Sequence, residues 1–245
     1  MVLPIGWGKQ ERADQREQKG QQTVMTSTQD APIKTAVVTG EHPFDVPGFH
    51  AVFRGIPSID FYPQHMDDFV ADWGQVRRSY DVVLFYNFHQ RTPGAQESWW
   101  NQGMRAVLEE LGSSTQGIVV LHHAILAFPQ WQLWSDICGI QDRSFVHHPD
   151  ETVRIDVAAP GHPITPEPVS WTIVDETYTM DEPAEGSDIL LTTANPRSMA
   201  AIAWTRQYGQ SRVFCFQSGH DNRVFADPSF RTIVARGIAW SAGRI

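Results

Sequence analysis

Four short polar groups in the second half of the chain contain histidine or neighbouring carboxylates. They are His122–His123, Gly161–Ile164, Asp175–Tyr178 and Ser218–Asp221. Each follows or interrupts an apolar run, so each is expected at a strand end or a turn. Imidazole and carboxylate groups that converge on one cleft perform general acid–base catalysis or bind a divalent metal. The residue types therefore predict one of these two kinds of chemistry.

Particular members of these groups are candidates for particular roles. The predicted catalytic residues are His122, Glu176 and His220. A catalytic zinc takes three protein ligands plus water. The metal hypothesis therefore assigns zinc or manganese to His122, His162 and His220. Five further residues near predicted strand ends are candidates for substrate binding: His50, His89, His123, Tyr178 and Asp221.

Each polar group taken alone also has a purely structural explanation. Adjacent residues in a strand point to opposite faces, so only one of His122 and His123 would face a cleft if the strand continues through both. A Gly-His-Pro turn can use its imidazole to bond a loop, and Asp175 can be a surface charge. No HExxH motif marks a metal site. Acid–base catalysis by histidine without a metal therefore stays an alternative.

Nucleophilic and nucleotide-dependent chemistry find little support. The chain has no Gly-x-Ser-x-Gly elbow. Cys138 falls in a predicted helix and Cys215 in a predicted strand, both with apolar neighbours, so both are expected in the core. Residues 40–42 after the first predicted strand do not make a GxGxxG loop. No nucleotide cofactor is expected.

The elements that position these groups follow from the apolar pattern. The continuous apolar run of residues 118–121 predicts a buried parallel strand, and ligands of open α/β sheets bind beyond the carboxyl ends of such strands. Up to this strand the pattern alternates between strand and helix, whereas residues 153–216 are mostly extended. The predicted strands are Lys34–Gly40, Ser58–Tyr62, Tyr80–Tyr86, Ile118–Leu121, Val153–Val157, Trp171–Val174, Asp188–Thr192, Ala200–Trp204 and Val213–Phe216. The predicted helices are His50–Gly55, Met66–Arg77, Glu97–Leu111, Trp131–Ile140 and Asp227–Ala242.

This order of elements predicts an α/β fold with a parallel sheet flanked by helices and with additional strands in the C-terminal half. Residues 31–245 are expected to form a single domain. Residues 1–30 are polar and carry few large apolar side chains, so they are predicted to be a disordered tail. Met1 and Met25 are both candidate starts of translation.

Composition limits the partners and the compartment. The net charge of −9 disfavours nucleic acid and anionic membranes as partners. No run reaches the ~18 apolar residues of a membrane span. Two cysteines without a CxxC motif favour a reduced, cytoplasmic setting. A homodimer is expected, since closed two-fold symmetry is the commonest assembly.

Several stretches resemble the ThuA-like (trehalose utilisation) family, over about residues 33–243. The most specific runs from the Trp-Thr-Arg-Gln-Tyr-Gly sequence of residues 204–209 to the Gly-His-Asp sequence of residues 219–221. The others are residues 81–84, 117–124, 161–165, 175–178 and 236–242. One departure is the turn at residues 115–117, where the family often has two or three consecutive glycines.

The resemblance implies a class I glutamine amidotransferase-like, flavodoxin-like fold. Amidotransferases of this kind carry a cysteine at the elbow after the central strand. Here His122 and His123 stand at that place, so no glutaminase activity is expected. The resemblance also implies a role in the catabolism of trehalose or related disaccharides, which makes a keto-sugar or glycoside a plausible substrate.

Two hypotheses of function follow. In the first, the protein is an enzyme that isomerises a keto-sugar or eliminates its glycosidic substituent. The chemistry is acid–base catalysis, either with or without the help of a metal ion. Trp131, Trp134 and Tyr178 are candidates for stacking on the sugar, although both tryptophans can equally belong to the core. In the second, the protein is a non-catalytic sugar-binding or assembly subunit with an amidotransferase-like fold. The enzyme is the favoured hypothesis.

Overall fold

The computed structural model describes residues 31–73, 75–94 and 102–245. Residues 32–245 cluster into one compact unit. The tail predicted over residues 1–30 and the start of the helix predicted at Glu97 lie outside the described residues.

The described elements alternate as expected as far as the fourth strand and are mainly extended afterwards. The strands are β1 (Ile33–Gly40), β2 (Ile59–His65), β3 (Val82–Asn87), β4 (Gly117–Leu121), β5 (Val146–Val157), β6 (Trp171–Thr179), β7 (Ser187–Thr192), β8 (Ala201–Tyr208) and β9 (Ser211–Phe216). The α-helices are α1 (Val46–Arg54), α2 (Met66–Ala71), α3 (Gln102–Glu109), α4 (Gln132–Cys138), α5 (Asn222–Ala226) and α6 (Pro228–Ser241). Two 3₁₀ helices, η1 (Arg77–Ser79) and η2 (His122–Leu126), complete the set.

The nine strands within the described residues join one sheet in the order β2-β1-β3-β4-β9-β8-β7-β5-β6. The first five strands in this order pair in parallel, with Val37 opposite Leu84 and Val119 opposite Phe214. This is the flavodoxin-like order. The remaining strands pair antiparallel and extend the sheet beyond β9. The predicted parallel sheet with additional strands in the C-terminal half is therefore confirmed.

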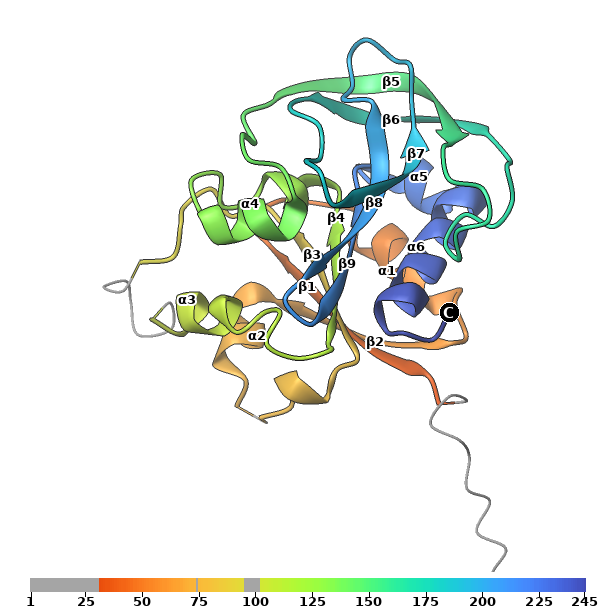
Figure 1. Cartoon of the computed structure of the whole chain (residues 1–245). Helices are drawn as coiled ribbons and strands as arrows, with labels where there is room; N and C mark the ends of the chain where they lie inside the picture. Colours follow the sequence, from red (N-terminus) through yellow and green to blue (C-terminus); the bar gives the residue numbers. More distant parts are fainter. Residues whose placement is uncertain (1–30, 74, 95–101) are drawn as a thin grey trace, which may run out of the picture. The chain divides into compact units, whose positions relative to one another are not determined.

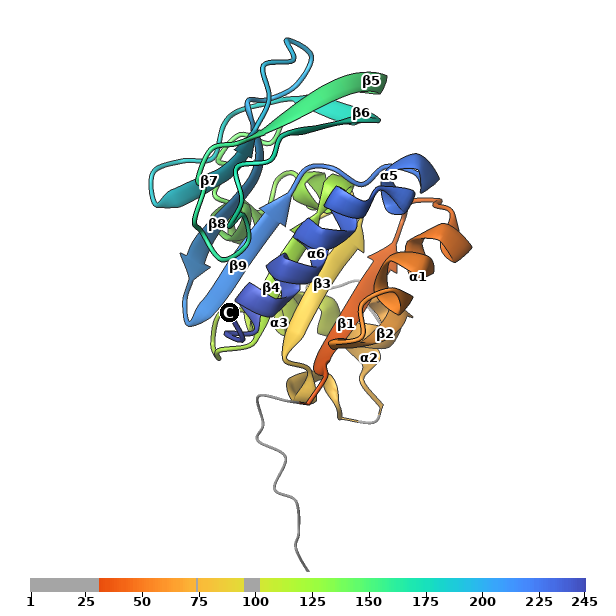
Figure 2. The same cartoon turned by 90° about the vertical axis from the view of Figure 1, so that its right-hand side faces the viewer.

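Helices cover both faces of the parallel part (Figures 1 and 2). Apolar side chains of α1, α5 and α6 pack on one face, and those of α2, α3 and α4 pack on the other. β3 and β4 are buried along their whole length, because each lies between two layers of helices. Gly117 allows α6 to approach β4 closely, since a Cβ there would lie 2.5 Å from the carbonyl oxygen of Ser241.

Three expectations about elements need correction. The Asp175–Tyr178 group lies inside β6 and not in a turn, because β5 supplies antiparallel partners for Asp175, Thr177 and Tyr178. β5 begins at Val146, seven residues before the predicted start, and a bulge between His148 and Glu151 accommodates Pro149. The predicted helix Met66–Arg77 ends at Ala71, where Asp72 adopts a left-handed conformation.

Candidate active site

His122 is the first residue after the central strand β4, and its backbone is strained. Its φ is +53°, a left-handed conformation that is uncommon for residues other than glycine. This left-handed conformation turns the chain sharply from β4 into η2. The imidazole of His122 is completely buried. Strained residues of this kind cluster at functional sites. The expected elbow after the central strand is present, with histidine in the strained position.

Four polar groups from the start of η2, from β6 and from the loop after β9 converge at this elbow. The Nε2 atom of His122 lies 2.8 Å from the hydroxyl of Tyr178 and 3.2 Å from Nδ1 of His220. The Tyr178 hydroxyl donates to Oε1 of Glu176 at 2.9 Å. Oε1 of Glu176 also lies 3.7 Å from His122 Nε2 and 3.5 Å from His220 Nδ1. These groups make one connected network.

The protonation of His122 follows from its partners. Nδ1 lies 2.7 Å from the carbonyl oxygen of Gln217, which can only accept a hydrogen bond, so Nδ1 carries the hydrogen. Burial lowers the pKa of His122 to about 3, so its ring is neutral near pH 7. The lone pair of Nε2 therefore faces Tyr178, Glu176 and His220. Burial also raises the pKa of Tyr178 well above its usual value, which keeps its hydroxyl a donor.

Asp175 fixes the loop that carries His220. This completely buried carboxylate accepts the backbone N–H of Gly219 at 3.0 Å and of His220 at 3.1 Å. It also accepts the backbone N–H of Glu176 at 2.9 Å. Burial raises the pKa of Asp175 to about 7, although these three amides oppose the rise. Gly219 has a φ of +133°, which a residue with a side chain rarely adopts.

A second pair of imidazoles lies beside the network. The ring of His123 stacks on that of His42, with centroids 4.2 Å apart and an angle of 25° between the planes. His42 also lies 6.1 Å from His220, edge to face. Burial lowers the pKa values of both His42 and His123. A backbone interaction with Pro43 opposes this shift at His42, and one with Tyr86 opposes it at His123. Neither ring nitrogen of His123 makes a well-formed hydrogen bond within the described chain. The ring of His123 is therefore neutral and lies next to the network.

The donor set fits a divalent metal ion. One ligand atom each from His122, Glu176 and His220 lie within 4.8 Å of one another. Two imidazoles and a carboxylate are ligands that zinc and other first-row divalent ions accept. Metal-binding histidines usually donate their other ring N–H to a carbonyl or carboxylate, as His122 does to Gln217. Glu176, and not His162, completes the group of three.

The structure brings five of the predicted site residues together. They are His122, His123, Glu176, Tyr178 and His220. Asp221 follows directly in the chain, but it caps α5 and binds Arg223, with its Oδ1 accepting the Arg223 backbone N–H at 2.9 Å. Its carboxylate therefore has a structural role.

The other three predicted residues lie elsewhere. His50 packs against Phe61 of β2, with ring centroids 6.1 Å apart. His89 follows β3 and stacks on Phe128. His162 packs on Trp240, and its Nδ1 accepts the backbone N–H of Ile164 at 3.1 Å. The predicted metal group of His122, His162 and His220 is therefore wrong in its second member, because the Gly-His-Pro turn folds against α6.

The predicted sugar-stacking role of two tryptophans is also wrong. Trp134 is completely buried between Phe85 and Phe128, and its indole N–H donates to the carbonyl of Ala124 at 2.8 Å. Trp131 is only 6% exposed and belongs to the same core. Their alternative assignment to the core is correct.

Sequence reasoning left His42 and Gln217 without a role in the site, and it placed Asp175 in a candidate polar group without a role of its own. His42 comes soon after the end of β1. Because β1 and β4 lie on either side of β3, this position after a strand indicated that His42 could lie near His122. Asp175 and Gln217 act through backbone contacts, which leave no motif in the sequence.

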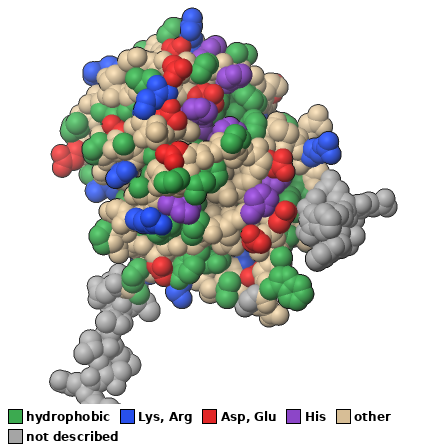
Figure 3. Space-filling view, turned by 180° about the vertical axis from the view of Figure 1, so that it is seen from behind, with side chains coloured by type: hydrophobic (Ala, Val, Ile, Leu, Met, Phe, Trp, Pro, Cys, Tyr) green, Lys and Arg blue, Asp and Glu red, His purple; other side chains and the backbone are tan. Residues whose placement is uncertain are grey.

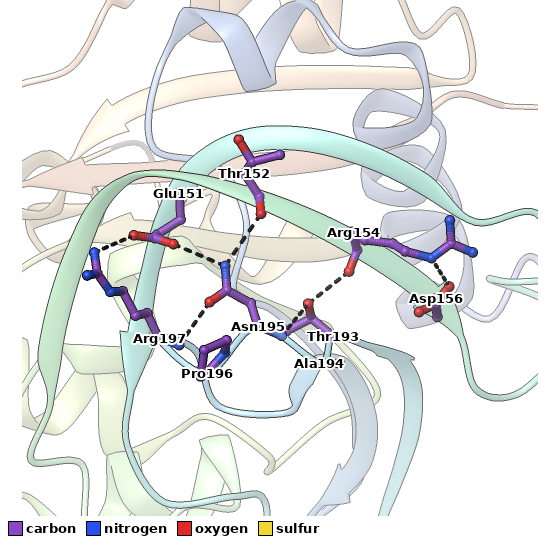
Figure 4. A pocket seen from close by; sticks show the side chains of 9 residues that line it. All are labelled: Glu151, Thr152, Arg154, Asp156, Thr193, Ala194, Asn195, Pro196 and Arg197. Atoms are coloured by element: carbon purple, nitrogen blue, oxygen red, sulfur yellow. Dashed lines mark hydrogen bonds and ion pairs between the residues drawn. The ribbon is translucent and has the colours of Figure 1, made fainter.

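Histidine and acidic side chains, with Lys and Arg side chains among them, are visible on one face of the molecule (Figure 3). A different hollow lies between β5 and the loop of residues 193–197 (Figure 4). Its polar groups bind one another: Glu151 accepts from Arg197 at 3.1 Å and from Asn195 at 3.2 Å. These pairs tie β5 to the loop and leave this hollow with internally satisfied groups.

Comparison with known proteins agrees with this architecture. The family described as ThuA, trehalose utilisation, matches residues 67–241. The chain belongs to the ThuA family. The family is named for trehalose utilisation, which supports a carbohydrate-related role. No curated protein matches the chain.

Solved structures similar to this ThuA-family chain share its fold. A putative ThuA-like protein from Parabacteroides merdae has a TM-score of 0.66 and 23% identity, and the match covers 86% of this chain and 90% of that one. A putative ThuA-like protein from Bacteroides uniformis also has a TM-score of 0.66, with 18% identity and coverage of 86% and 92%. A putative GMP synthase protein from Thermoplasma acidophilum has a TM-score of 0.52, with 12% identity and coverage of 85% and 94%. The amidotransferase-like fold is thereby confirmed.

No helix within residues 31–73, 75–94 and 102–245 combines the length and apolar character needed to cross a bilayer.

Proposed function

We propose that this ThuA-family protein acts on a keto-sugar or keto-glycoside of disaccharide catabolism by acid–base chemistry. The observation that carries the proposal is the convergence of His122, Glu176 and His220 within 4.8 Å. The family's association with trehalose utilisation supports a sugar as substrate.

The reaction that suits these groups begins with removal of a proton next to a carbonyl. A keto group at C3 of a glycoside acidifies the C2–H bond. A base that removes this proton leaves an enediolate, which hydrogen-bond donors or cations stabilise. The enediolate either is reprotonated, giving an isomer, or expels the C1 substituent with its bonding electrons. In the second case an acid protonates the departing oxygen.

Solvent exposure separates the roles of the three residues. The side chains of His220 and Glu176 are 32% and 14% exposed, whereas that of His122 is completely buried. A ring whose pKa is about 3 is also a weak base. We therefore assign proton transfer to Glu176 and His220. His122 acts as a neutral acceptor or ligand that orients them, and Tyr178 supplies a neutral hydroxyl donor.

In the metal-assisted alternative, a divalent ion, zinc or manganese, would be held by His122, Glu176 and His220, and these residues would then act as ligands and not in proton transfer. Such an ion would supply Lewis-acid stabilisation of the oxygen on which negative charge develops. Within the protein, the Gln217 carbonyl orients His122 and the Asp175 carboxylate orients the His220 backbone.

Proton exchange tests this proposal without requiring the complete reaction. The protein is incubated with 3-keto-trehalose in D₂O, and loss of the C2–H signal is followed by NMR together with release of glucose. Metal content is measured by elemental analysis on the same sample. The wild type is expected to exchange this proton, and Glu176→Gln and His220→Asn are expected to slow exchange at least 100-fold.

Asp156→Asn is the matched control, because Asp156 is an exposed carboxylate of β5 paired with Arg154. It should exchange like the wild type. Binding of the keto-sugar without any exchange or release would contradict the enzyme proposal and would favour the sugar-binding subunit.

A further inference from the structure

We infer that Phe88 and Phe145 form an apolar platform for the second pyranose ring of a disaccharide bound at the His122–Glu176–His220 site. This inference rests on the proposed function, because it specifies the substrate of the same site. Neither phenylalanine carries a polar group, so its contribution would be binding and specificity and not proton transfer.

The two phenylalanines complete a closed circuit of ring contacts around the site. Phe88 lies 5.6 Å from His42, and Phe145 lies 5.7 Å from Tyr178, in both cases edge to face. The two phenylalanine rings are 6.4 Å apart. Three further ring contacts close the circuit: Tyr178 with His122, His122 with His220, and His220 with His42. The full order is His42, Phe88, Phe145, Tyr178, His122 and His220. The apolar side of this circuit is therefore made by Phe88 and Phe145.

Packing of the fold does not explain these two side chains. Both are partly exposed, and neither belongs to the apolar clusters on the two faces of the sheet in the described chain. Large apolar side chains normally gain stability by burial in such clusters. Phe88 also contacts His123, with centroids 5.7 Å apart, so its ring contacts are with His42, His123 and Phe145. An apolar ring that borders polar catalytic groups and remains partly exposed is suited to a ligand.

The combination of groups indicates the class of ligand. A pyranose ring has a face of C–H groups and an edge of hydroxyls. Aromatic rings bind the C–H face, while the imidazole and carboxylate groups of His220 and Glu176 can bind oxygen atoms. A one-ring sugar engaged at the polar groups would leave the platform uncovered. A disaccharide would cover both parts, so the platform predicts a preference for two rings over one.

Binding of unreactive sugars tests the platform separately from catalysis. The dissociation constants of trehalose and of methyl α-glucoside are measured by titration calorimetry for the full-length wild type, Phe88→Ala, Phe145→Ala and Phe145→Leu. The wild type is expected to bind trehalose about three- to tenfold more tightly than methyl α-glucoside. Each alanine variant should lose most of this difference. Phe145→Leu keeps apolar volume without the aromatic face, so it should show a partial loss even if the alanine variant is poorly folded.

Trp73→Ala is the control, since Trp73 is an 88% exposed aromatic residue outside the circuit. It should retain the wild-type preference. Equal affinity of the wild type for both sugars, or an unchanged preference in Phe145→Leu together with Phe88→Ala, would overturn the inference. Failure of the proton-exchange test alone would not, because sugar affinity is measured without turnover.

Discussion

The Nδ1 atom of His122 lies 2.7 Å from the carbonyl oxygen of Gln217, and this contact decides what His122 can do. It places the hydrogen on Nδ1 and directs the lone pair of Nε2 toward Glu176 and His220. The left-handed backbone at His122 makes the contact possible, because it turns the chain immediately after β4. The neutral, oriented imidazole is a suitable metal ligand or hydrogen-bond acceptor.

His122→Asn is expected to keep the fold and to lose zinc binding. Asparagine tolerates positive φ better than most residues, so the elbow should survive. Zinc affinity should fall more than about tenfold, because a ligand atom is removed. Calorimetric titration of the chelator-treated protein with zinc measures this change. Equal affinity in the variant and the wild type would exclude His122 as a ligand.

Zinc should stabilise the folded wild-type protein by mass action. At a free concentration of 100 times its Kd, a ligand that binds only the folded state adds about 2.7 kcal/mol to the free energy of unfolding. The melting temperature should therefore rise with added zinc and fall again with chelator. His220→Asn should show little response, and magnesium in place of zinc is the control ion.

His122 and Asp175 should have opposite effects on the pH dependence of stability. The pKa of His122 is lowered from 6.5 to about 3, so its contribution is present above pH 6.5 and is lost as the pH falls toward 3. The pKa of Asp175 is raised from 3.8 to about 7, so its contribution is present below pH 3.8 and is lost as the pH rises toward 7. Between these limits the two contributions oppose each other, each by about 1.4 kcal/mol per pH unit.

Replacing either residue alone should change how the free energy of unfolding depends on pH. In Asp175→Asn the free energy of unfolding should rise with pH more steeply than in the wild type, and in His122→Asn less steeply. Urea unfolding with chelator present, at several pH values between 4.5 and 6.0, measures both slopes. Parallel curves for all three proteins would show that neither residue titrates as assigned.

Asp175→Asn should also weaken zinc binding, although Asp175 supplies none of the three ligand atoms. The amide N–H groups of Gly219 and His220 would lose a charged acceptor, and the loop that carries His220 would be less constrained. Loss of such an indirect partner typically costs about 10- to 100-fold in metal affinity. Asp156→Asn is the exposed control. Wild-type affinity in Asp175→Asn would mean that the loop is held by other contacts.

Arg143→Met should destabilise the protein by more than about 2 kcal/mol. The buried guanidinium donates to the carbonyls of Ile125, Ala127, Phe128 and Trp131 and to Oγ of Ser135. Methionine keeps much of the volume but removes all of these hydrogen bonds, and within the described chain only the carbonyls of Phe128 and Trp131 are also bonded by backbone N–H groups nearby. Chemical denaturation measures the loss. The exposed Arg154→Met should change stability by less than about 0.5 kcal/mol, and a similar small change at Arg143 would contradict the assignment.

The sequence by itself determined the parallel core and the elbow of this protein. Buried strands such as β4 require continuous apolar runs because helices cover both faces, and such runs are visible in the sequence. His122, His123 and His220 follow strands of this kind. The flavodoxin-like arrangement brings the carboxyl ends of these strands to one edge, so their convergence could be predicted.

Only the tertiary structure decided which side chains complete the site. Glu176 and Tyr178 reach His122 because antiparallel strands extend the sheet and lay β6 near the elbow, a relationship across more than 50 residues that local patterns do not encode. His162 lies away from the site because the turn that carries it packs on α6. The tautomer of His122 and the support from Asp175 depend on single backbone atoms. Backbone atoms are common to all residues, so no residue type indicates such contacts in advance.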